Sequence, residues 1–242
     1  MSKTFWNTFY ELLDFVFDDS EYFHQRFFIA CKINNIELVN LLLLFDCDPL
    51  TNNAAIRVAA QNGHIDVVDR LLQDGRVDPS VNNNFAIRMA SANGHVAVVD
   101  RLLQDGTGRV DPSVNDNYAI RWASKNGHIA VIDRLLQEDR VDPSADDNFA
   151  IRYASHNGHI AVVDRLLQDR RVDPSAYNNC SIRWASNNGH LAVVDRLLQD
   201  SRVDPSANNN EAIRLASEKG HIAVVDRLKQ EDKSRVKLDT QT

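Results

Sequence analysis

The chain has only three cysteines among its 242 residues, Cys31, Cys47 and Cys180, and their spacing fits no metal-binding or redox motif. A low and odd cysteine count argues against a disulfide framework and favours a reducing compartment. The longest uncharged apolar run, residues 41–45, is far too short to cross a bilayer. Acidic residues between positions 11 and 19 interrupt the apolar N-terminus, so it does not resemble a signal peptide. We therefore expect a soluble cytoplasmic protein.

Basic clusters are also missing, because 27 Lys and Arg residues are spread along a chain that holds 34 Asp and Glu residues and has a net charge of -7. A nucleic-acid binder concentrates its basic residues on one patch, and an acidic chain is not attracted to an anionic membrane. We expect neither nucleic acid nor membrane as a partner. There is no nucleophile–base set and no glycine-rich phosphate loop, so we expect no enzyme activity and no cofactor.

The dominant feature that is present is an internal repeat. Six Gly-His pairs begin at residues 63, 94, 127, 158, 189 and 220, at steps of 31, 33, 31, 31 and 31 residues. The longer step follows from a two-residue insertion around Thr107 and Gly108. Residues 28–49 have the same layout without the Gly-His pair, and we interpret them as a divergent first repeat. Self-similarity at such a period is typical of a solenoid, here with about seven repeats.

Each repeat is predicted to contain two helices. Helix A runs through the motif AIRxAS and ends at the glycine, which adopts a left-handed conformation without steric penalty. It begins after an asparagine that we predict to be its N-cap, at positions 53, 84, 117, 148, 179 and 210. Helix B is HIAVVDRLLQ, with a broad apolar face at helical spacing. An Asp-Pro pair then favours a turn into the next repeat.

One repeat cannot fold alone. Burying the five aliphatic side chains of helix B contributes roughly 8–15 kcal/mol, whereas ordering 31 residues costs at least ~30 kcal/mol of backbone entropy. Neighbouring repeats must supply the missing burial. We therefore divide the chain into an N-terminal helical cap (1–26), a repeat domain (27–232) and a flexible tail (233–242). Lys229 replaces a leucine of the earlier repeats, so the last repeat is expected to be a polar cap.

The layout resembles the ankyrin repeat over about residues 27–230, with Gly-His between two antiparallel helices and Leu-Leu late in the second. The family motif TPLHxA appears here as AIRxA, and the usual 33-residue period is 31. This divergent form is similar to repeats in viral and protist ankyrin proteins. The resemblance implies an all-α ankyrin-type helical solenoid of about seven helix-turn-helix repeats. It also implies that helix A and the turns face the partner on a concave side.

Three recurring polar rows are predicted to be structural. The six histidines of the Gly-His pairs cannot share a metal ion, because equivalent residues in a stack lie roughly 10 Å apart. The helix A arginines could recognise phosphate, but an Arg-to-Asp ladder between repeats fits the many aspartates better; these arginines are Arg57, Arg88, Arg121, Arg152, Arg183 and Arg214. On helix B, Asp164 and Arg165 are expected on a solvated face, with a weak pair between Arg165 and Asp169.

Positions that vary between copies are the better candidates for function, because stacking does not require a particular residue there. The first such column, expected to be solvent-exposed, is Gln61, Ala92, Lys125, His156, Asn187 and Glu218. The second is Ala54, Phe85, Tyr118, Phe149, Cys180 and Glu211, and the third is Val58, Met89, Trp122, Tyr153, Trp184 and Leu215. The rings of the third column are either binding anchors or inter-repeat packing. Our candidate partner-binding residues are Phe85, Met89, Tyr118, Trp122, Lys125, Phe149, Tyr153, His156, Tyr177 and Trp184.

These observations predict a monomeric, non-catalytic module that binds an unidentified protein through the helix A and turn face. A first alternative is an adaptor that recruits a second protein through its N-terminal helices, in the manner of an F-box protein, although the leucine-proline start of such a segment is absent. Burial of Phe9 and Phe15 against the first repeat would favour a cap instead. A second alternative is an enzyme, which would need a pocket with converging titratable groups.

Overall fold

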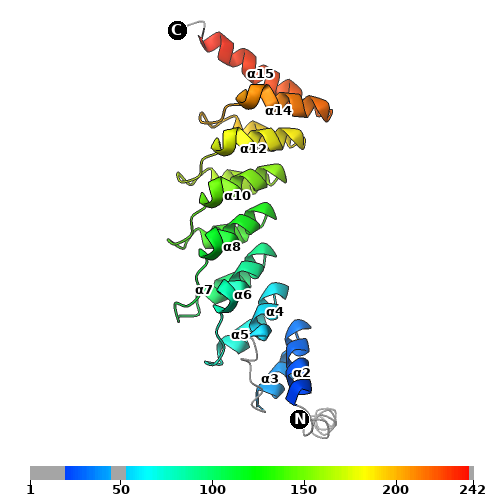
Figure 1. The fold of residues 1–242 in the computed structure, drawn as a ribbon, viewed down its shortest axis with the longest axis vertical. Helices are drawn as coiled ribbons and strands as arrows, with labels where there is room; N and C mark the ends of the chain where they lie inside the picture. The colour runs from blue at the N-terminus through cyan, green and yellow to red at the C-terminus, as the bar shows by residue number, and fades with distance from the viewer. Residues whose placement is uncertain (1–19, 45–52, 240–242) are drawn as a thin grey trace.

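The computed structural model describes residues 20–44 and 53–239, and within these ranges the chain forms fourteen α-helices stacked in pairs (Figure 1). The helices are α2 (Ser20–Lys32), α3 (Ile36–Leu44), α4 (Ala54–Asn62), α5 (Ile65–Leu72), α6 (Val81–Ala92), α7 (Val96–Leu103), α8 (Val114–Lys125), α9 (Ile129–Leu135), α10 (Ala145–His156), α11 (Ile160–Leu166), α12 (Ala176–Asn187), α13 (Leu191–Leu197), α14 (Ala207–Glu218) and α15 (Ile222–Asp239). Even-numbered helices are helix A of each repeat and odd-numbered helices are helix B. The prediction of an all-α solenoid of about seven repeats is confirmed.

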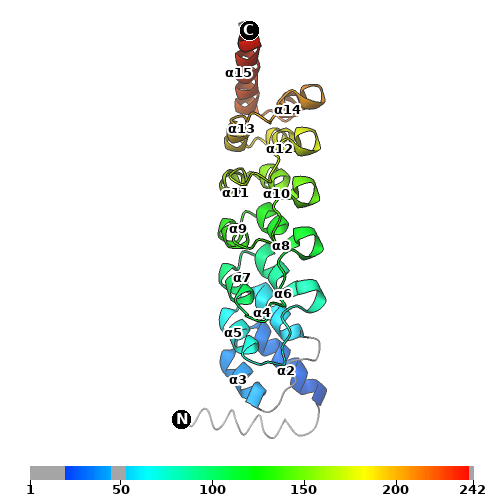
Figure 2. The same cartoon turned by 90° about the vertical axis from the view of Figure 1, so that its left-hand side faces the viewer.

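The repeats stack in two parallel rows, with helix A against the next helix A and helix B against the next helix B (Figure 2). Their core is a set of repeated apolar columns. One column of helix A is fully buried, namely Ile56, Ile87, Ile120, Ile151 and Ile182, and so is one column of helix B, namely Leu71, Leu102, Leu135, Leu166 and Leu197. These columns belong to one continuous cluster that extends from Phe27 to Leu228. The stack therefore has one shared core, as the energetics of a single repeat require.

The Gly-His pairs join each repeat to the one before it. Gly158 has a φ of 76° and follows helix A in the left-handed conformation, as predicted. The ring Nε2 of His159 donates to the backbone oxygen of Lys125 at 3.0 Å, and the side-chain nitrogen of Asn157 donates to the same oxygen at 2.7 Å. Both bonds reach the end of the preceding helix A, whose last carbonyls have no intrahelical partner. The structural role predicted for these histidines is confirmed.

The prediction that an asparagine caps helix A is wrong. Within the first turn of α10, three consecutive residues have left-handed backbones, Asp146 (φ 57°), Asp147 (φ 52°) and Asn148 (φ 59°). An N-cap residue has an extended backbone and bonds its own helix, so Asn148 cannot act as one. Its side-chain oxygen instead accepts a hydrogen bond of 2.7 Å from the backbone nitrogen of Asp173 in the next repeat.

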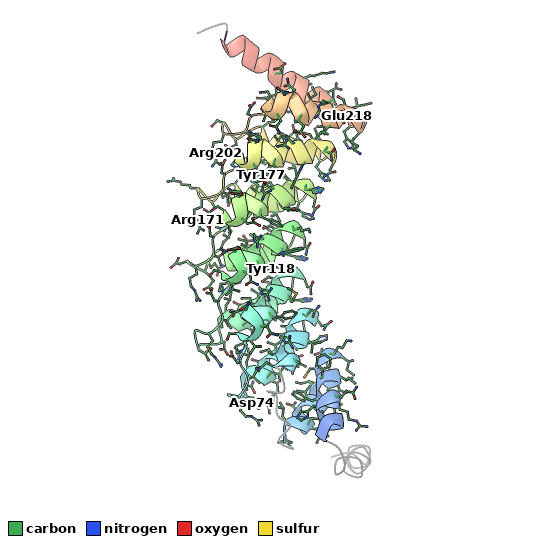
Figure 3. The ribbon with its side chains drawn as sticks, viewed as in Figure 1. Asp74, Tyr118, Arg171, Tyr177, Arg202 and Glu218 are labelled. Atoms are coloured by element: carbon green, nitrogen blue, oxygen red, sulfur yellow. The ribbon has the colours of Figure 1, made fainter. Side chains whose placement is uncertain are left out.

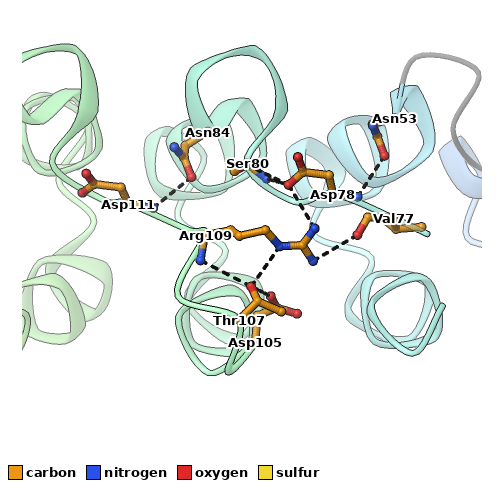
Figure 4. A network of polar contacts seen from close by, with 9 residues as sticks. All are labelled: Asn53, Val77, Asp78, Ser80, Asn84, Asp105, Thr107, Arg109 and Asp111. Carbon is orange, nitrogen blue, oxygen red and sulfur yellow. Dashed lines mark hydrogen bonds and ion pairs between the residues drawn. The ribbon is translucent and has the colours of Figure 1, made fainter. Parts of the chain in front are cut away.

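The same asparagine bond recurs along the stack. Figure 4 shows it between Asn53 and the nitrogen of Asp78, at 3.1 Å, and between Asn84 and the nitrogen of Asp111, at 2.9 Å. The figure also shows how the two-residue insertion is accommodated. The Nε of Arg109 donates to Thr107 in the extended loop, and the guanidinium reaches the backbone oxygen of the preceding repeat. The insertion lengthens the loop and leaves this contact between repeats in place.

Helix B carries an ion-pair ladder between repeats, whereas the sequence analysis predicted such a ladder for the helix A arginines. Arg165 pairs with Asp133 of the preceding repeat at 2.7 Å, while Asp169 pairs with Arg171 at 2.7 Å. Arg165 and Asp169 therefore form no salt bridge with each other, and the expected weak pair remains only as a Coulombic attraction that lowers the pKa of Asp169. Equivalent bridges between repeats are Arg101–Asp69, Arg134–Asp100, Arg196–Asp164 and Arg227–Asp195. The Asp and Arg side chains of this face were expected only to contact solvent. They instead form ion pairs that link each helix B to the next, from α5 to α15.

The two ends differ from the middle of the stack. The predicted boundary between cap and repeats, at residues 26 and 27, falls inside α2, which pairs with α3. At the other end α15 continues to Asp239, through most of the segment assigned to the tail. Lys229 is exposed where Leu198 is buried in the preceding repeat. Phe9 and Phe15, which decide between a cap and a recruitment segment, lie outside the described residues. No helix in the described part of the chain is long and apolar enough to span a membrane.

Candidate partner-binding face

Several helix A arginines stabilise the backbone of the left-handed turns on this face. Arg152 is 8% exposed and donates from Nε to the backbone oxygen of Asp147 at 2.8 Å and from Nη2 to that of Asp146 at 3.0 Å. Arg88 and Arg183 bond the equivalent carbonyls of their own repeats. A guanidinium offers several donors in a fixed fork and thus holds the left-handed turn in place.

The predicted Arg-to-Asp ladder from these helix A arginines is mostly wrong. Among the described residues it is realised by Arg121 with Asp146, and by Arg183 with a glutamate, Glu211, at 2.8 Å. Of the others, Arg88 and Arg152 bond backbone carbonyls and Arg57 lies over the ring of Phe85. Arg214 pairs with Glu218 in its own helix. The backbone geometry explains the difference, because the left-handed turn presents its carbonyls to the arginine of its own repeat.

The helix A arginines before the last repeat also lie against a side chain from the next repeat. The guanidinium carbon of Arg88 lies 5.0 Å from the ring centre of Tyr118, and that of Arg121 lies 5.0 Å from the ring centre of Phe149. The next repeat has Cys180 where these aromatics stand. There Tyr177, three residues earlier, lies over Arg152 at 4.8 Å instead. The cation–π contact is thus kept by a residue from a different position.

The aromatic side chains of the second and third columns form a continuous row across three repeats. The ring centres of Tyr118 and Trp122 are 5.3 Å apart, and those of Trp122 and Phe149 are 6.3 Å apart. Phe149 stacks on Tyr153 at 3.9 Å, and Tyr153 meets Trp184 edge to face at 5.3 Å. All five side chains are half-buried. They therefore pack between repeats and still expose part of each ring; we call them the aromatic row.

Lys125 and His156 lie beside the aromatic row. The ammonium of Lys125 is 4.2 Å from the ring centre of Trp122 and 5.4 Å from that of Tyr153. The ring of His156 is 5.3 Å from that of Trp184. Burial lowers the pKa of His156, and the nearby His190 and Lys125 lower it further. The imidazole is accordingly neutral at neutral pH.

The first variable column is less exposed than expected. Gln61 and Glu218 at the two ends are exposed, but Ala92 is buried, and Lys125, His156 and Asn187 are half-buried. The prediction of a solvent-exposed column is therefore wrong for the middle repeats. The cause is the next repeat, whose asparagine and histidine bond the carbonyls of this column and cover its side chains.

The structure brings together seven of the ten predicted residues, namely Tyr118, Trp122, Lys125, Phe149, Tyr153, His156 and Trp184. Phe85 lies one repeat before these seven residues, with its ring between the guanidinium groups of Arg57 and Arg88. Met89 is half-buried in the same helix. Tyr177 is separate from the row and is 64% exposed. Figure 3 places Tyr118 and Tyr177 over the even-numbered helices and Arg171 and Arg202 at the loops between repeats.

Two carboxylates near the aromatic row were missed by sequence reasoning. Asp116 and Asp147 are exposed and occupy equivalent positions in the left-handed turns before the α8 and α10 rings. The same position carries asparagine in the other full repeats, at Asn83, Asn178 and Asn209. A comparison of this column would have found them. The column lies one residue before the recurring asparagine, in the segment that the sequence predicts to be a turn.

Other parts of the described chain offer less to a ligand. No group of three His, Cys, Asp or Glu side chains among the described residues could hold a metal ion. A cavity of about 290 Å³ lies in the last repeat and is lined by Asp204, Pro205, Ser206, Asn210, Ile213, Leu228, Lys229 and Asp232. None of these residues belongs to the aromatic row.

Comparison with protein families agrees with the repeat geometry. A family model described as ankyrin repeats (3 copies) matches residues 27–116 and again residues 88–178. The two matches together span more than half of the chain. A comparison with curated proteins finds no match.

Proposed function

The chain belongs to the ankyrin repeat family, and we propose that it is a non-catalytic module that binds a partner protein across its helix A face, on the aromatic row. Ankyrin repeats are in general protein–protein interaction modules. The observation that carries the proposal is the row itself, in which five rings from α8, α10 and α12 are in contact and each remains partly open to solvent. Tryptophan and tyrosine are the residues most enriched at binding hot spots.

The scaffold does not need these rings. The third column carries Val58, Met89 and Leu215 in other repeats, which stack in the same way. A tryptophan in this column therefore adds exposed apolar area that folding leaves uncovered. Covering it with a partner contributes roughly 25 cal/mol per Å². This excess supports a role in binding beyond packing between repeats.

The first test replaces rings with residues that the same column already uses. We expect Trp122→Met and Trp184→Leu to leave the melting temperature within a few degrees of the wild type, because Met89 and Leu215 occupy equivalent sites. Partner capture by the same variants should fall at least about tenfold, the usual effect of truncating a hot spot. Loss of capture together with loss of the folded state would not support the proposal, so circular dichroism accompanies each measurement.

The second test locates the partner directly. A photo-crosslinking residue at position 125 lies beside the aromatic row, and one at the exposed Gln168 lies at the end of helix B. We expect adducts with a partner from position 125 and few from position 168. Adducts only from position 168 would place the partner on the other side of the stack and overturn the proposal.

A further inference from the structure

Resting on the proposed function, we infer that the partner is a polypeptide segment that presents lysine or arginine side chains next to an apolar anchor. The anchor covers Trp122, Tyr153 and Trp184, and the basic groups meet Asp116 and Asp147. The ankyrin fold itself does not determine the charge of the partner.

The two carboxylates occupy positions where the backbone conformation does not require a charged residue. Asp116 and Asp147 have left-handed backbones, with φ of 54° and 52°, and Asn83, Asn178 and Asn209 adopt the same conformation at the same position. Asparagine and aspartate both tolerate this region because their short side chains bond locally. Folding therefore explains a small polar residue here and leaves the charge unexplained. The charge occurs in α8 and α10, the two helices that carry the centre of the aromatic row.

The charge of these residues is not neutralised by the chain. Asp116 and Asp147 are exposed, and no described residue forms an ion pair with either side chain. Their neighbour Asp146 shows the contrast, since it pairs with Arg121. The nearby guanidinium of Arg152 is buried and donates to backbone carbonyls. Two uncompensated carboxylates thus remain on the solvent side of the turns.

The cationic groups on the same face are less available, because the helix A arginines of α6, α8, α10 and α12 donate to the backbone carbonyls of their own turns. The ammonium of Lys125 lies over two rings of the aromatic row, so an acidic partner would have to draw it away from them. Burial, His190 and Lys125 lower the pKa of His156, so its imidazole is a weaker cationic group than a free histidine. The whole chain has a net charge of -7, which also attracts basic partners over a longer range. Charge complementarity therefore favours a basic segment over an acidic or phosphorylated one.

The test selects peptides from a random 12-residue display library against the full-length chain. Selected peptides are then synthesised, together with versions in which every Lys and Arg is replaced by Gln. We expect the selected sequences to be enriched in basic residues beside aromatic or aliphatic ones. We expect the double variant Asp116→Asn, Asp147→Asn to bind them about tenfold more weakly at low salt, with the difference shrinking as salt rises.

Asp66→Asn is the matched control, because it removes one exposed carboxylate from α5 on helix B and should change affinity less than about twofold. Selection of acidic or uncharged peptides overturns the inference, as does unchanged affinity in the double variant. If Trp184→Leu weakens binding while the double variant does not, the face is correct and only the charge inference fails. If no selected peptide loses affinity with Trp184→Leu, the proposed function fails as well.

Discussion

The imidazole of His190 packs directly on the α-carbon of Gly158 in the preceding repeat, so that a β-carbon at residue 158 would lie 2.6 Å from Nδ1 of the ring. Four other Gly-His contacts between repeats have the same geometry, with a β-carbon 2.5–2.7 Å from Nδ1. The glycine therefore serves two purposes, since it takes a left-handed backbone and leaves room for the next histidine.

These two purposes can be separated by comparing Gly158 with Gly220. Gly220 has almost the same φ, 75° against 76°, but no atom lies within 4 Å of a β-carbon built on it. We expect Gly220→Ala to cost about 1–2 kcal/mol from backbone strain alone. Gly158→Ala should destabilise by clearly more, because the ring of His190 must also move. Urea unfolding followed by circular dichroism measures both, and equal losses would contradict the contact.

The sequence predicted the fold because its signals lie within one repeat. Apolar spacing and the glycine stop define the two helices, and self-similarity predicts the stack. The contacts that were missed join residues of different repeats, as Gly158 joins His190 and Asn148 joins the nitrogen of Asp173. In an array of near-identical copies the sequence shows that Asn148 recurs, but it does not show which repeat Asn148 bonds. The residues of the aromatic row could be chosen as candidates because they vary while the scaffold does not, and their role in binding stays a prediction.

The ion pair between Arg165 and Asp133, which are 32 residues apart, is expected to give a small coupling energy between neighbouring repeats. Arg165 is 30% and Asp133 is 52% exposed in their side chains, so their coupling should be at most about 0.2–1 kcal/mol. A double-mutant cycle with Arg165→Ala and Asp133→Ala measures this energy. The control is the cycle of Arg165→Ala with Asp169→Ala, which should show a smaller coupling, because Arg165 acts on Asp169 only by Coulombic attraction while Asp169 bonds Arg171. A larger coupling in the control cycle would restore the pair within helix B and contradict the ladder.

The stability of the chain should fall on acidification below the ordinary carboxyl pKa. Side-chain hydrogen bonds from Arg171 lower the pKa of Asp169 below its ordinary value of 3.8. Arg76 lowers the pKa of Asp74 in the same way, and Arg202 that of Asp200. Burial opposes the shift in all three carboxylates. Between the folded and the unfolded pKa the unfolded chain binds more protons. The stability from these groups is therefore complete above 3.8 and is lost as the pH falls through the folded value.

Urea unfolding between neutral and strongly acidic pH tests this dependence. We expect Asp169→Asn to flatten the acid limb of the stability curve, because it removes the titrating carboxylate. Arg171→Met should flatten it as well, because it removes the guanidinium hydrogen bonds to Asp169. A curve of unchanged slope in both variants would show that the pair does not lower this pKa.

Ser155 is expected to be replaceable by alanine. Its hydroxyl is fully buried and has no hydrogen-bond partner, and the repeat of α4 has Ala60 at the same position. Removing a buried unpaired hydroxyl relieves a desolvation penalty of about 1–3 kcal/mol, so Ser155→Ala should raise the free energy of unfolding. Ser217→Ala is the control, because that hydroxyl is exposed and donates to the backbone oxygen of Ile213 at 2.8 Å. Destabilisation by Ser155→Ala would reveal a partner for the hydroxyl.

Tyr177 is expected to supply the aromatic contact with Arg152 that Cys180 cannot make. It has a φ of 58°, a conformation that costs a tyrosine about 1–2 kcal/mol, at a position where the repeats of α6, α8, α10 and α14 have asparagine or aspartate. Its contact with Arg152 offsets this strain by a comparable amount. Tyr177→Asn alone should therefore change stability little. In a Cys180→Phe background a ring again stands at the position of Phe149, so the same substitution should now be stabilising by about 1 kcal/mol.

The double-mutant cycle of Tyr177→Asn and Cys180→Phe separates strain from contact. Strain belongs to residue 177 in both backgrounds and cancels in the cycle, whereas the contact with Arg152 is replaced only when the phenylalanine is present. Coupling between the two substitutions, measured by urea unfolding, supports the exchange of one aromatic residue for another. Additive effects would mean that Tyr177 is not held in its strained backbone by Arg152. Its 64% exposed side chain would then have to be explained by contact with a partner.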